Sequence, residues 1–144
     1  MAGHRVAAGG TLVLDSEGLS KLASGDARAR SYLEVARARR ARVVASAITL
    51  TEVLRGGGRD ALAHRVLSRI TIVPVSAEIA RAAGELLCAT GMSGHRCAID
   101  AVVAATALEL ARPVVILTSD PDDLNQLVDE PERPKHERVV VHHV

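Results

Sequence analysis

Short apolar runs bounded by polar or turn-forming residues recur along the chain, and they predict buried strands. The predicted strands are Leu12–Leu14, Arg42–Ala45, Ile70–Val73, Val114–Leu117 and Arg138–Val141. Between these runs, apolar residues recur at helical spacing instead. The predicted helices are Leu19–Ala23, Ala27–Arg40, a helix that starts near Thr49 and runs through Leu54, Asp60–Ser68, Ala77–Ala89, Ala98–Leu110 and Asp122–Val128.

Turn-forming residues fix several of these boundaries. The glycines at 56–58 stop a helix, Pro74 ends the third strand, and Ser76 is placed to cap the next helix. Pro121 lies in the first turn of the last helix, where proline is tolerated. Residues 130–137 are polar, contain two prolines and are predicted to form a loop.

Continuous Val/Ile/Leu strands that alternate with helices are typical of a buried parallel sheet with helices on both faces. The 144 residues fit one domain, and we find no internal repeat or long linker. We therefore expect a single α/β domain over residues 11–144, preceded by a flexible tail over residues 1–10. The tail lacks the apolar core of a signal peptide, and no apolar stretch reaches the roughly 20 residues that cross a bilayer. We expect no contact with a membrane.

Cysteine usage and composition narrow the function classes. Cys88 and Cys97 are not in a CxxC arrangement, and we interpret them as reduced, partly buried thiols of a cytoplasmic protein. Tyr32 is the single aromatic residue, so the core must consist of Leu, Val, Ile and Ala. The same scarcity argues against a base-stacking platform for single-stranded nucleic acid.

The formal net charge of +1 gives no global field that would attract nucleic acid, although a local patch still can. One basic stretch comprises Arg28, Arg30, Arg37, Arg39, Arg40 and Arg42. This stretch can hold an RNA backbone through its phosphates, or it can be a solvated helix face, and the sequence leaves both interpretations open.

Four carboxylates stand in apolar surroundings. Asp15 and Asp120 follow predicted strands, whereas Glu52 and Asp100 lie within apolar helical segments. A carboxylate in such surroundings is unfavourable unless it is paired, hydrogen-bonded or bound to a cation. No matching set of lysines or arginines lies nearby in the sequence, which indicates a shared cation. An all-oxygen site suits Mg²⁺ or Mn²⁺ rather than zinc, so metal-assisted phosphodiester chemistry is the leading interpretation.

The four positions are expected to converge. Functional residues of open α/β sheets gather outside the carboxyl ends of the strands, where Asp15 and Asp120 belong. Glu52 and Asp100 lie early in helices and can point to the same edge. Each position also has a purely structural interpretation, as an N-cap for the two residues after strands or as a helix-surface charge for the two within helices.

The segments that carry these carboxylates resemble those of PIN domains, and most closely those of VapC-type toxins of bacterial type II toxin–antitoxin pairs. The matching segments are Leu12–Ser16, Ser46–Leu54, Ala98–Ala107 and Val115–Leu124, in family order and across nearly the whole chain. The resemblance implies a three-layer α/β/α fold with a central parallel five-stranded sheet. By motif match the four carboxylates fall on the family's metal site, and Asp123 falls on a further acidic position.

The resemblance also implies Mg²⁺- or Mn²⁺-dependent endoribonuclease activity on RNA, a homodimer, and a cognate antitoxin whose C-terminal segment covers the acidic site. The chain departs from the family pattern at two places. Many relatives have Thr-Ser or Thr-Asn after the first aspartate, where this chain has Ser16-Glu17. Many also have a basic residue where this chain has Ser119, which removes one candidate phosphate contact.

Asp15 and Asp100 are the best candidates for direct metal ligands. Glu52 and Asp120 can ligate directly or through water, because Mg²⁺ usually keeps several waters. One carboxylate, with Asp120 as the candidate, can orient the attacking water.

Neighbouring polar residues have supporting roles in this interpretation. Ser16 and Thr118 can hydrogen-bond the ligands and fix their rotamers, although Ser16 can instead cap the following helix. His95 and Arg96 precede the predicted helix of Asp100. They can touch a phosphate or an antitoxin, or they can be loop residues without a role.

Two other functions stay open. A receiver-like signalling module needs a phosphoacceptor aspartate after its third strand and a lysine after its fifth. Here Pro74 and Val75 follow Val73, and no lysine follows the last strand, so this interpretation ranks far below the first. The other alternative is a PIN-fold binding protein without nuclease activity. The four intact carboxylates argue against this alternative.

Overall fold

The computed structural model describes residues 9–144, so residues 1–8 of the expected tail lie outside the described part of the chain. Gly9 and Gly10 belong to the described part. Gly10 is buried with φ +76, and a Cβ on it would collide with the carbonyl oxygen of Pro113.

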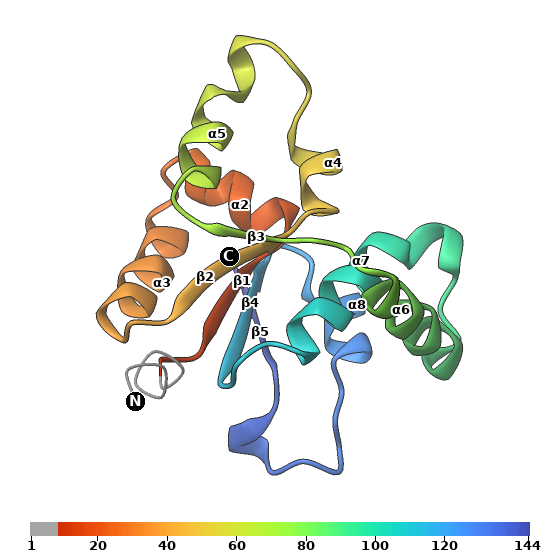
Figure 1. The fold of residues 1–144 in the computed structure, drawn as a ribbon. Coiled ribbons are helices and arrows are strands. Elements are labelled where there is room, and N and C mark those ends of the chain that lie inside the picture. The colour runs from red at the N-terminus through yellow and green to blue at the C-terminus, as the bar shows by residue number, and fades with distance from the viewer. Residues whose placement is uncertain (1–8) are drawn as a thin grey trace.

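The centre of the molecule is a five-stranded sheet in the order β3-β2-β1-β4-β5, with every neighbouring pair parallel (Figure 1). The strands are β1 (Thr11–Leu14), β2 (Arg42–Ser46), β3 (Thr71–Val73), β4 (Val114–Thr118) and β5 (Val140–His143). The predicted parallel sheet is confirmed. The middle strand β1 is entirely buried, as expected of a strand covered on both faces.

Helices cover both faces of the sheet and make three layers (Figure 1). They are α2 (Ser16–Ala23), α3 (Ala27–Ala38), α4 (Thr49–Val53), α5 (Ala61–Leu67), α6 (Ala77–Thr90), α7 (Gly94–Leu108) and α8 (Pro121–Leu127), with single 3₁₀ turns at Gly58–Asp60 and Lys135–Glu137. The alternation of side chains along β1 divides the core in two. Leu12 and Leu14 pack with residues of α2, α3 and α5, whereas Val13 packs with residues of α6, α7 and α8.

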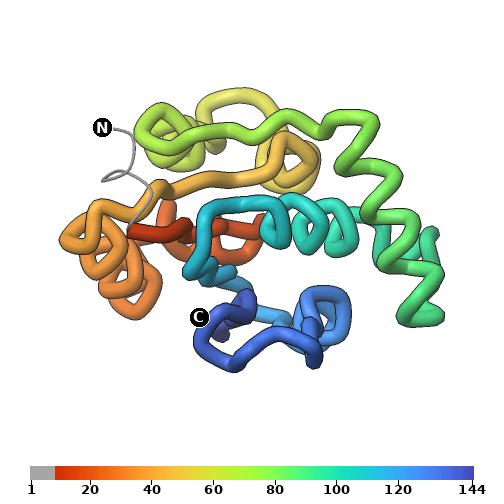
Figure 2. Tube along the Cα trace, turned by 60° about the horizontal axis from the view of Figure 1, so that its bottom comes forward, coloured from red at the N-terminus to blue at the C-terminus, as the bar shows by residue number. Residues whose placement is uncertain are grey.

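Two helices begin earlier than the hydrophobic pattern predicts. Helix α2 begins at Ser16 rather than Leu19, because the Asp15 carboxylate caps it. Helix α7 begins at Gly94 rather than Ala98, so the break between α6 and α7 is confined to residues 91–93. Glycine destabilises a helix most when it lies in the helix interior, so a glycine in the first turn is tolerated. Helix α6 and the start of α7 extend beyond the sheet as a pair (Figures 1 and 2).

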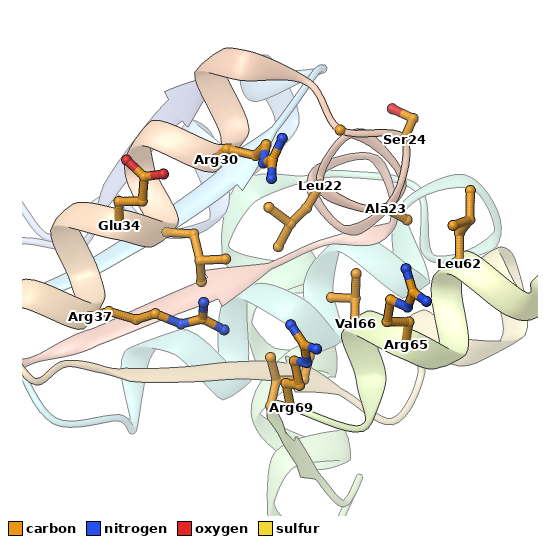
Figure 3. Close-up of a pocket in the computed structure, with 13 residues that line it drawn as sticks. Leu22, Ala23, Ser24, Arg30, Glu34, Arg37, Leu62, Arg65, Val66 and Arg69 are labelled. Atoms are coloured by element: carbon orange, nitrogen blue, oxygen red, sulfur yellow. The ribbon is translucent and has the colours of Figure 1, made fainter.

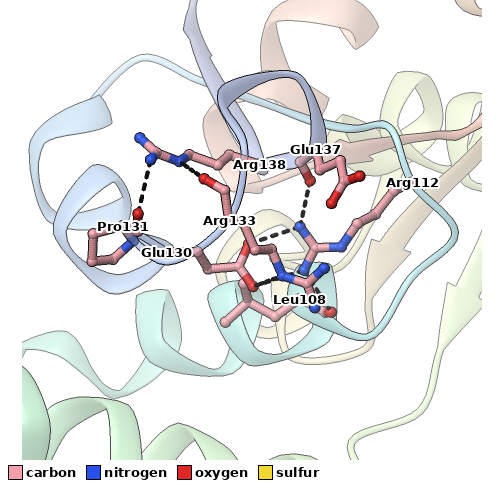
Figure 4. A network of polar contacts seen from close by, with 7 residues as sticks. All are labelled: Leu108, Arg112, Glu130, Pro131, Arg133, Glu137 and Arg138. Atoms are coloured by element: carbon pink, nitrogen blue, oxygen red, sulfur yellow. Dashed lines mark hydrogen bonds and ion pairs between the residues drawn. The ribbon is translucent and has the colours of Figure 1, made fainter.

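The last strand begins at Val140, two residues later than predicted. The residues before it belong to a loop that is held by a polar network around Arg112 and Glu130 (Figure 4). Arg138 donates to the carbonyl oxygens of Arg133 and Pro131, and it therefore closes this loop instead of starting the strand. Arg112 donates to the carbonyl oxygens of Leu108 and Glu137, which fastens the loop to the end of α7.

Two findings concern individual side chains, and one concerns the helices. Cys97 is buried and Cys88 is exposed, so only one of the two thiols is shielded from solvent. The Tyr32 ring lies 5.1 Å from the His142 ring, between α3 and β5. Among the described residues, no helix has both the length and the apolar character that a membrane span requires.

Candidate active site

The carboxyl ends of the parallel strands meet at one edge of the sheet, and the predicted site residues lie there. Asp15 follows the last residue of β1, and Asp120 comes two residues after the end of β4. The register pairs Leu14 with Leu117, so the two strands end side by side. Asp15 donates its backbone N–H to the carbonyl oxygen of Leu117 at 3.3 Å, which ties the two segments together.

Asp15 is held rigidly at the N-terminus of α2. Its side chain is 7% exposed, and its Oδ1 accepts the N–H of Gly18 at 2.7 Å. Burial raises the pKa of the Asp15 carboxyl, and the hydrogen bonds from Gly18 and Thr118 only partly counteract that rise. The N-cap interpretation of Asp15 is therefore confirmed. The two oxygens of a carboxylate offer about four acceptor positions, so the contacts with Gly18 and Thr118 still leave room for a cation.

Asp120 also stands at an N-cap position, but its carboxylate accepts no capping hydrogen bond in helix α8. Its backbone is held instead by Thr118, whose buried hydroxyl accepts the Asp120 N–H at 3.1 Å. Thr118 therefore contacts the Asp15 carboxylate and the backbone of Asp120, and its role in orienting metal ligands stays a prediction. The side chain of Asp120 is exposed at this edge.

Asp100 is half-buried on α7, and the charge of every other candidate carboxylate affects its ionisation. Burial raises the pKa of Asp100 most, and the negative charges of Asp123, Asp15, Glu52 and Asp120 raise it further, to about 6. Like charges perturb one another in this way only over short distances. Asp15 before α2, Glu52 of α4, Asp120 before α8 and Asp123 of α8 are therefore near enough for their charges to act on Asp100.

Glu52 lies on the short helix α4, and its side chain is exposed. Its charge contributes to the raised pKa of Asp100, so it faces the same region. Thr49 precedes Glu52 on this helix and is fully buried. Its hydroxyl is the one buried side-chain oxygen or nitrogen without a hydrogen-bond partner in the part of the chain that the structure describes.

Cys97 is a residue near the site that the sequence interpretation did not place there. Its Sγ lies 3.9 Å from Oδ2 of Asp123, and burial together with the charges of Asp123 and Asp100 raises the pKa of the Cys97 thiol. The thiol therefore stays protonated at neutral pH and can donate to Asp123. The signal was present in the sequence, because Cys97 precedes Asp100 by three residues and shares its helix face.

The remaining predicted residues take up different positions. Ser16 is the first residue of α2, so the cap of this helix is Asp15 and not Ser16. His95 and Arg96 are exposed in the first turn of α7, and the prediction of a loop at this point is wrong. Glu17 is exposed and accepts the Ser119 hydroxyl at 3.2 Å, so the two places that depart from the family pattern contact each other.

The donor set fits a hard divalent cation. The carboxylates around Asp100 are all oxygen donors, and the three ion pairs of the described residues involve none of them. In residues 9–144 no three His, Cys, Asp or Glu side chains lie close enough to surround an ion as they stand. Mg²⁺ tolerates this arrangement, because it commonly takes one or two carboxylates and completes its shell with water.

Comparisons with known proteins concern the fold that carries these residues. In overall fold the chain is similar to a structure of VapBC2 from Rickettsia felis bound to a promoter DNA fragment, with a TM-score of 0.63 and 18% identity over 92% of this chain and 98% of that chain. It is also similar to a toxin–antitoxin complex from Klebsiella pneumoniae, with a TM-score of 0.59 and 26% identity over 78% of this chain and 88% of that chain.

No curated protein matches the chain in sequence. A family model does match, and it covers residues 12–129, from the first strand through the end of the last α-helix. This range contains all of the carboxylates gathered around Asp100. The chain therefore belongs to the PIN domain family.

Proposed function

We propose that this chain is a Mg²⁺- or Mn²⁺-dependent endoribonuclease, a VapC-type toxin that acts in the cytoplasm as a homodimer and is neutralised by a cognate antitoxin. The observation that carries the proposal is the gathering of acidic side chains without basic partners around Asp100. Membership of the PIN family and the likeness to chains from toxin–antitoxin complexes support it.

The geometry suggests a role for each carboxylate. Asp15 and Asp100 would hold the ion, with Glu52 and Asp120 ligating directly or through water. A bound divalent ion supplies charge stabilisation at the phosphate and lowers the pKa of water. Asp15 is fixed by Gly18 and Thr118 before any ion arrives, so little reorganisation is needed. Asp120 is exposed and uncapped, which leaves its carboxylate able to accept a hydrogen bond from the attacking water.

The test is cleavage of a 5′-labelled RNA that contains single-stranded and hairpin regions. We expect cleavage with Mg²⁺ or Mn²⁺ and none with excess chelator. Asp100→Asn should lower the rate by more than about a hundredfold, because even residues that only support a metal ligand cost ten- to hundredfold. The folded state of the variant is checked by circular dichroism.

Asp129→Asn is the matched control, because Asp129 is an exposed aspartate that contributes nothing to the raised pKa of Asp100. Its cleavage rate should equal that of the wild type. Cleavage that survives either chelator or the Asp100 substitution would rule out the metal role.

A second candidate function is a PIN-fold binding protein without nuclease activity. The observation that favours it is the spacing of the site, since no three ligating side chains of the described residues already surround one point. Titration of Mn²⁺ separates the two functions. The nuclease requires Mn²⁺ binding that Asp100→Asn weakens, whereas the binding protein predicts no such site.

A further inference from the structure

The carboxyl edge of the sheet, where the acidic site lies, also carries one basic residue. The five strands end at Leu14, Ser46, Val73, Thr118 and His143. Of these residues and the one or two that follow each of them, His143 alone can carry positive charge, whereas Asp15, Glu17 and Asp120 are acidic. His143 therefore differs in charge from the rest of this edge.

The strand register places His143 beside the acidic site. It is paired with Thr118, and the N–H of Val144 donates to the carbonyl oxygen of Thr118 at 2.8 Å, so β4 and β5 end side by side. Neighbouring strands lie about 4.8 Å apart. Thr118 in turn contacts the Asp15 carboxylate and the backbone of Asp120. His143 is thus one strand spacing from a residue that contacts two of the candidate metal ligands.

His143 also lies on the face of the sheet to which Asp100 belongs. Side chains alternate along a strand, so His143 shares a face with Val141. Val141 packs with the core residues of α6, α7 and α8, and α7 carries Asp100. The preceding residue, His142, belongs to the other face, where its ring lies against Tyr32 of α3. Only one of the two adjacent histidines is therefore on the side of the acidic site.

The His143 side chain is available to a ligand. It is exposed, and within residues 9–144 it has no ion-pair partner. An imidazole has at least one N–H donor in either of its protonation states. The carboxylates of this edge repel phosphates and a bound ion would offset that repulsion locally, so a separate donor suits a phosphate beyond the ion.

The position of His143 indicates which phosphate it can reach. Strand β4 lies between β1 and β5, so His143 and the end of β1 are two strand spacings, about 10 Å, apart. A phosphate held at Asp15 and Asp100 is too far away for a hydrogen bond from a side chain on β5. The ligand of His143 is therefore a different phosphate of the same strand.

We propose that His143 binds an RNA phosphate that flanks the cleaved one and thereby positions the strand across the acidic edge. That the anionic ligand is RNA rests on the nuclease function proposed above. Phosphate contacts fix the register of a nucleic acid without reading its sequence. Such contacts matter here, because Tyr32 is the single Phe, Trp or Tyr of the chain and bases have little to stack on.

The test measures the affinity for a 5′-labelled single-stranded RNA by fluorescence anisotropy, in the Asp100→Asn background with excess chelator so that the RNA stays intact. His143→Ala should weaken binding about three- to tenfold, because a hydrogen bond to a charged phosphate is lost. His143→Glu should weaken binding more than His143→Ala does, since it adds repulsion. His143→Lys should restore the affinity and steepen its salt dependence relative to His143→Ala by about 0.7 in the log–log slope, as one added phosphate contact on a single strand requires.

His136 provides the matched control. It is an exposed histidine in the 3₁₀ turn Lys135–Glu137, which precedes β5 and so lies toward the opposite end of that strand. His136→Ala and His136→Glu make the same chemical changes as the two variants at 143 and should change the affinity less than about twofold. Circular dichroism checks that all variants are folded.

Cleavage with Mn²⁺ separates binding from chemistry. In the otherwise unaltered chain His143→Ala should raise KM by about the factor seen in the affinity and change kcat less than about twofold, because the flanking phosphate is bound equally in the ground state and the transition state. Mn²⁺ binding, measured by titration without RNA, should be unchanged by His143→Ala.

Three outcomes would overturn the proposal. The first is an RNA affinity that is unaffected by His143→Ala and His143→Glu, or that is absent in every variant. The second is an equal loss of affinity at positions 136 and 143. The third is weaker Mn²⁺ binding by His143→Ala, which would place the histidine in the shell of the ion. A chain that binds RNA through His143 but never cleaves it would contradict the nuclease function alone, whereas cleavage that is indifferent to His143 would contradict this proposal alone.

Discussion

At the scale of single residues, Asp100 is the group whose ionisation is most affected by its neighbours. Its pKa is about 6 in the folded protein, against an ordinary value of 3.8. The folded state therefore binds this proton more tightly than the unfolded state does. As the pH rises from about 4 to about 6, the folded state loses stability relative to the unfolded state, and above about 6 the full penalty remains.

Asp100→Asn should consequently stabilise the metal-free protein at pH 7. The full shift corresponds to about 3 kcal/mol, but Asp100 is only half-buried and solvent screening reduces this to about 1 kcal/mol. The expected rise in Tm is about 2 to 4 °C by scanning calorimetry. The difference should shrink at pH 4, where Asp100 is protonated in the folded wild type, and Asp129→Asn should show no such rise.

Gly18 determines how closely helix α2 approaches the sheet. A Cβ at this position would collide with the backbone carbonyl oxygen of Leu117. Gly18→Ala should therefore lower the free energy of unfolding by about 1 to 3 kcal/mol, since a backbone atom must move.

Gly84→Ala is the matched control for that substitution. Gly84 lies within α6, where a Cβ meets no atom within 4 Å. The control should stabilise the protein by about 0.5 to 1 kcal/mol, because alanine is the better helix former. Urea denaturation measures both effects, and equal changes in the same direction would contradict the close approach of α2.

At the scale of elements, the polar network around Arg112 connects helix α7, the loop at residues 129–139 and the start of β5. Arg112 binds Glu130 with two contacts of 2.7 and 2.9 Å and also donates to two backbone carbonyl oxygens. Burial alone would raise the pKa of the Glu130 carboxyl, but the hydrogen bonds and charges of Arg112 and then Arg133 outweigh it and lower the pKa. The network is therefore formed at neutral pH.

Arg112→Ala should lower the free energy of unfolding by about 1 to 2 kcal/mol at pH 7, because charged hydrogen bonds to a partly buried carboxylate and to helix-end carbonyls are lost. The loss should diminish as the pH falls through the lowered pKa of Glu130, since its protonation removes the same contacts from the wild type. Arg133→Ala is the comparison. Its side chain is 44% exposed and makes one contact with Glu130, so less than about 0.5 kcal/mol is expected by denaturation.

The hydrophobic pattern was enough to predict some boundaries of helices and strands but not others. All five strands and the order of the helices could be predicted, because strands buried on both faces have a clear signature in sequence. The starts of α2 and α7 could not, because the pattern locates only the first apolar residue of each helix. At α2 the Asp15 cap decides the first helical residue, whereas Ser93 before α7 makes no capping hydrogen bond. The late start of β5 depends on Arg138 binding distant carbonyl oxygens, which no local pattern reveals.

The candidate site was predictable to a similar degree. Strand ends placed Asp15 and Asp120 at one edge, since parallel strands share a direction. The contacts of Cys97 with Asp123 and of Glu17 with Ser119 were not foreseen, because they join residues far apart in the chain. The groove between α2, α3 and α5, which Arg37, Arg65 and Arg69 line, also needed the structure (Figure 3). The sequence showed the arginines of α3, but only the fold brings Arg65 and Arg69 to them.

At the scale of the whole molecule, one face of the sheet and its carboxyl edge carry different surfaces. The face covered by α2, α3 and α5 carries a groove between these helices, and the carboxyl edge carries the acidic site. Both depend on β1, the middle strand, which pairs with β2 on one side and with β4 on the other. The pairing with β4 joins residues from opposite ends of the chain.

A chain that ends at Arg112 should therefore remain unfolded. It lacks β4, whose Val114, Ile116 and Leu117 are fully buried, and β1 would be left with one unpaired edge. The shortened chain is compared with the full chain by far-UV circular dichroism and by the dispersion of amide chemical shifts in NMR spectra. A cooperative unfolding transition in the shortened chain would contradict the central role of this pairing.

The late arrival of β4 has a consequence for how the protein is made. A ribosome incorporates Asp15, Glu52 and Asp100 before it adds β4, which carries Thr118, and then Asp120. The growing polypeptide therefore has an incomplete acidic edge during most of its synthesis. For the ribonuclease proposed here, the translating ribosome and its messenger are exposed to a finished catalyst only once the chain is nearly complete.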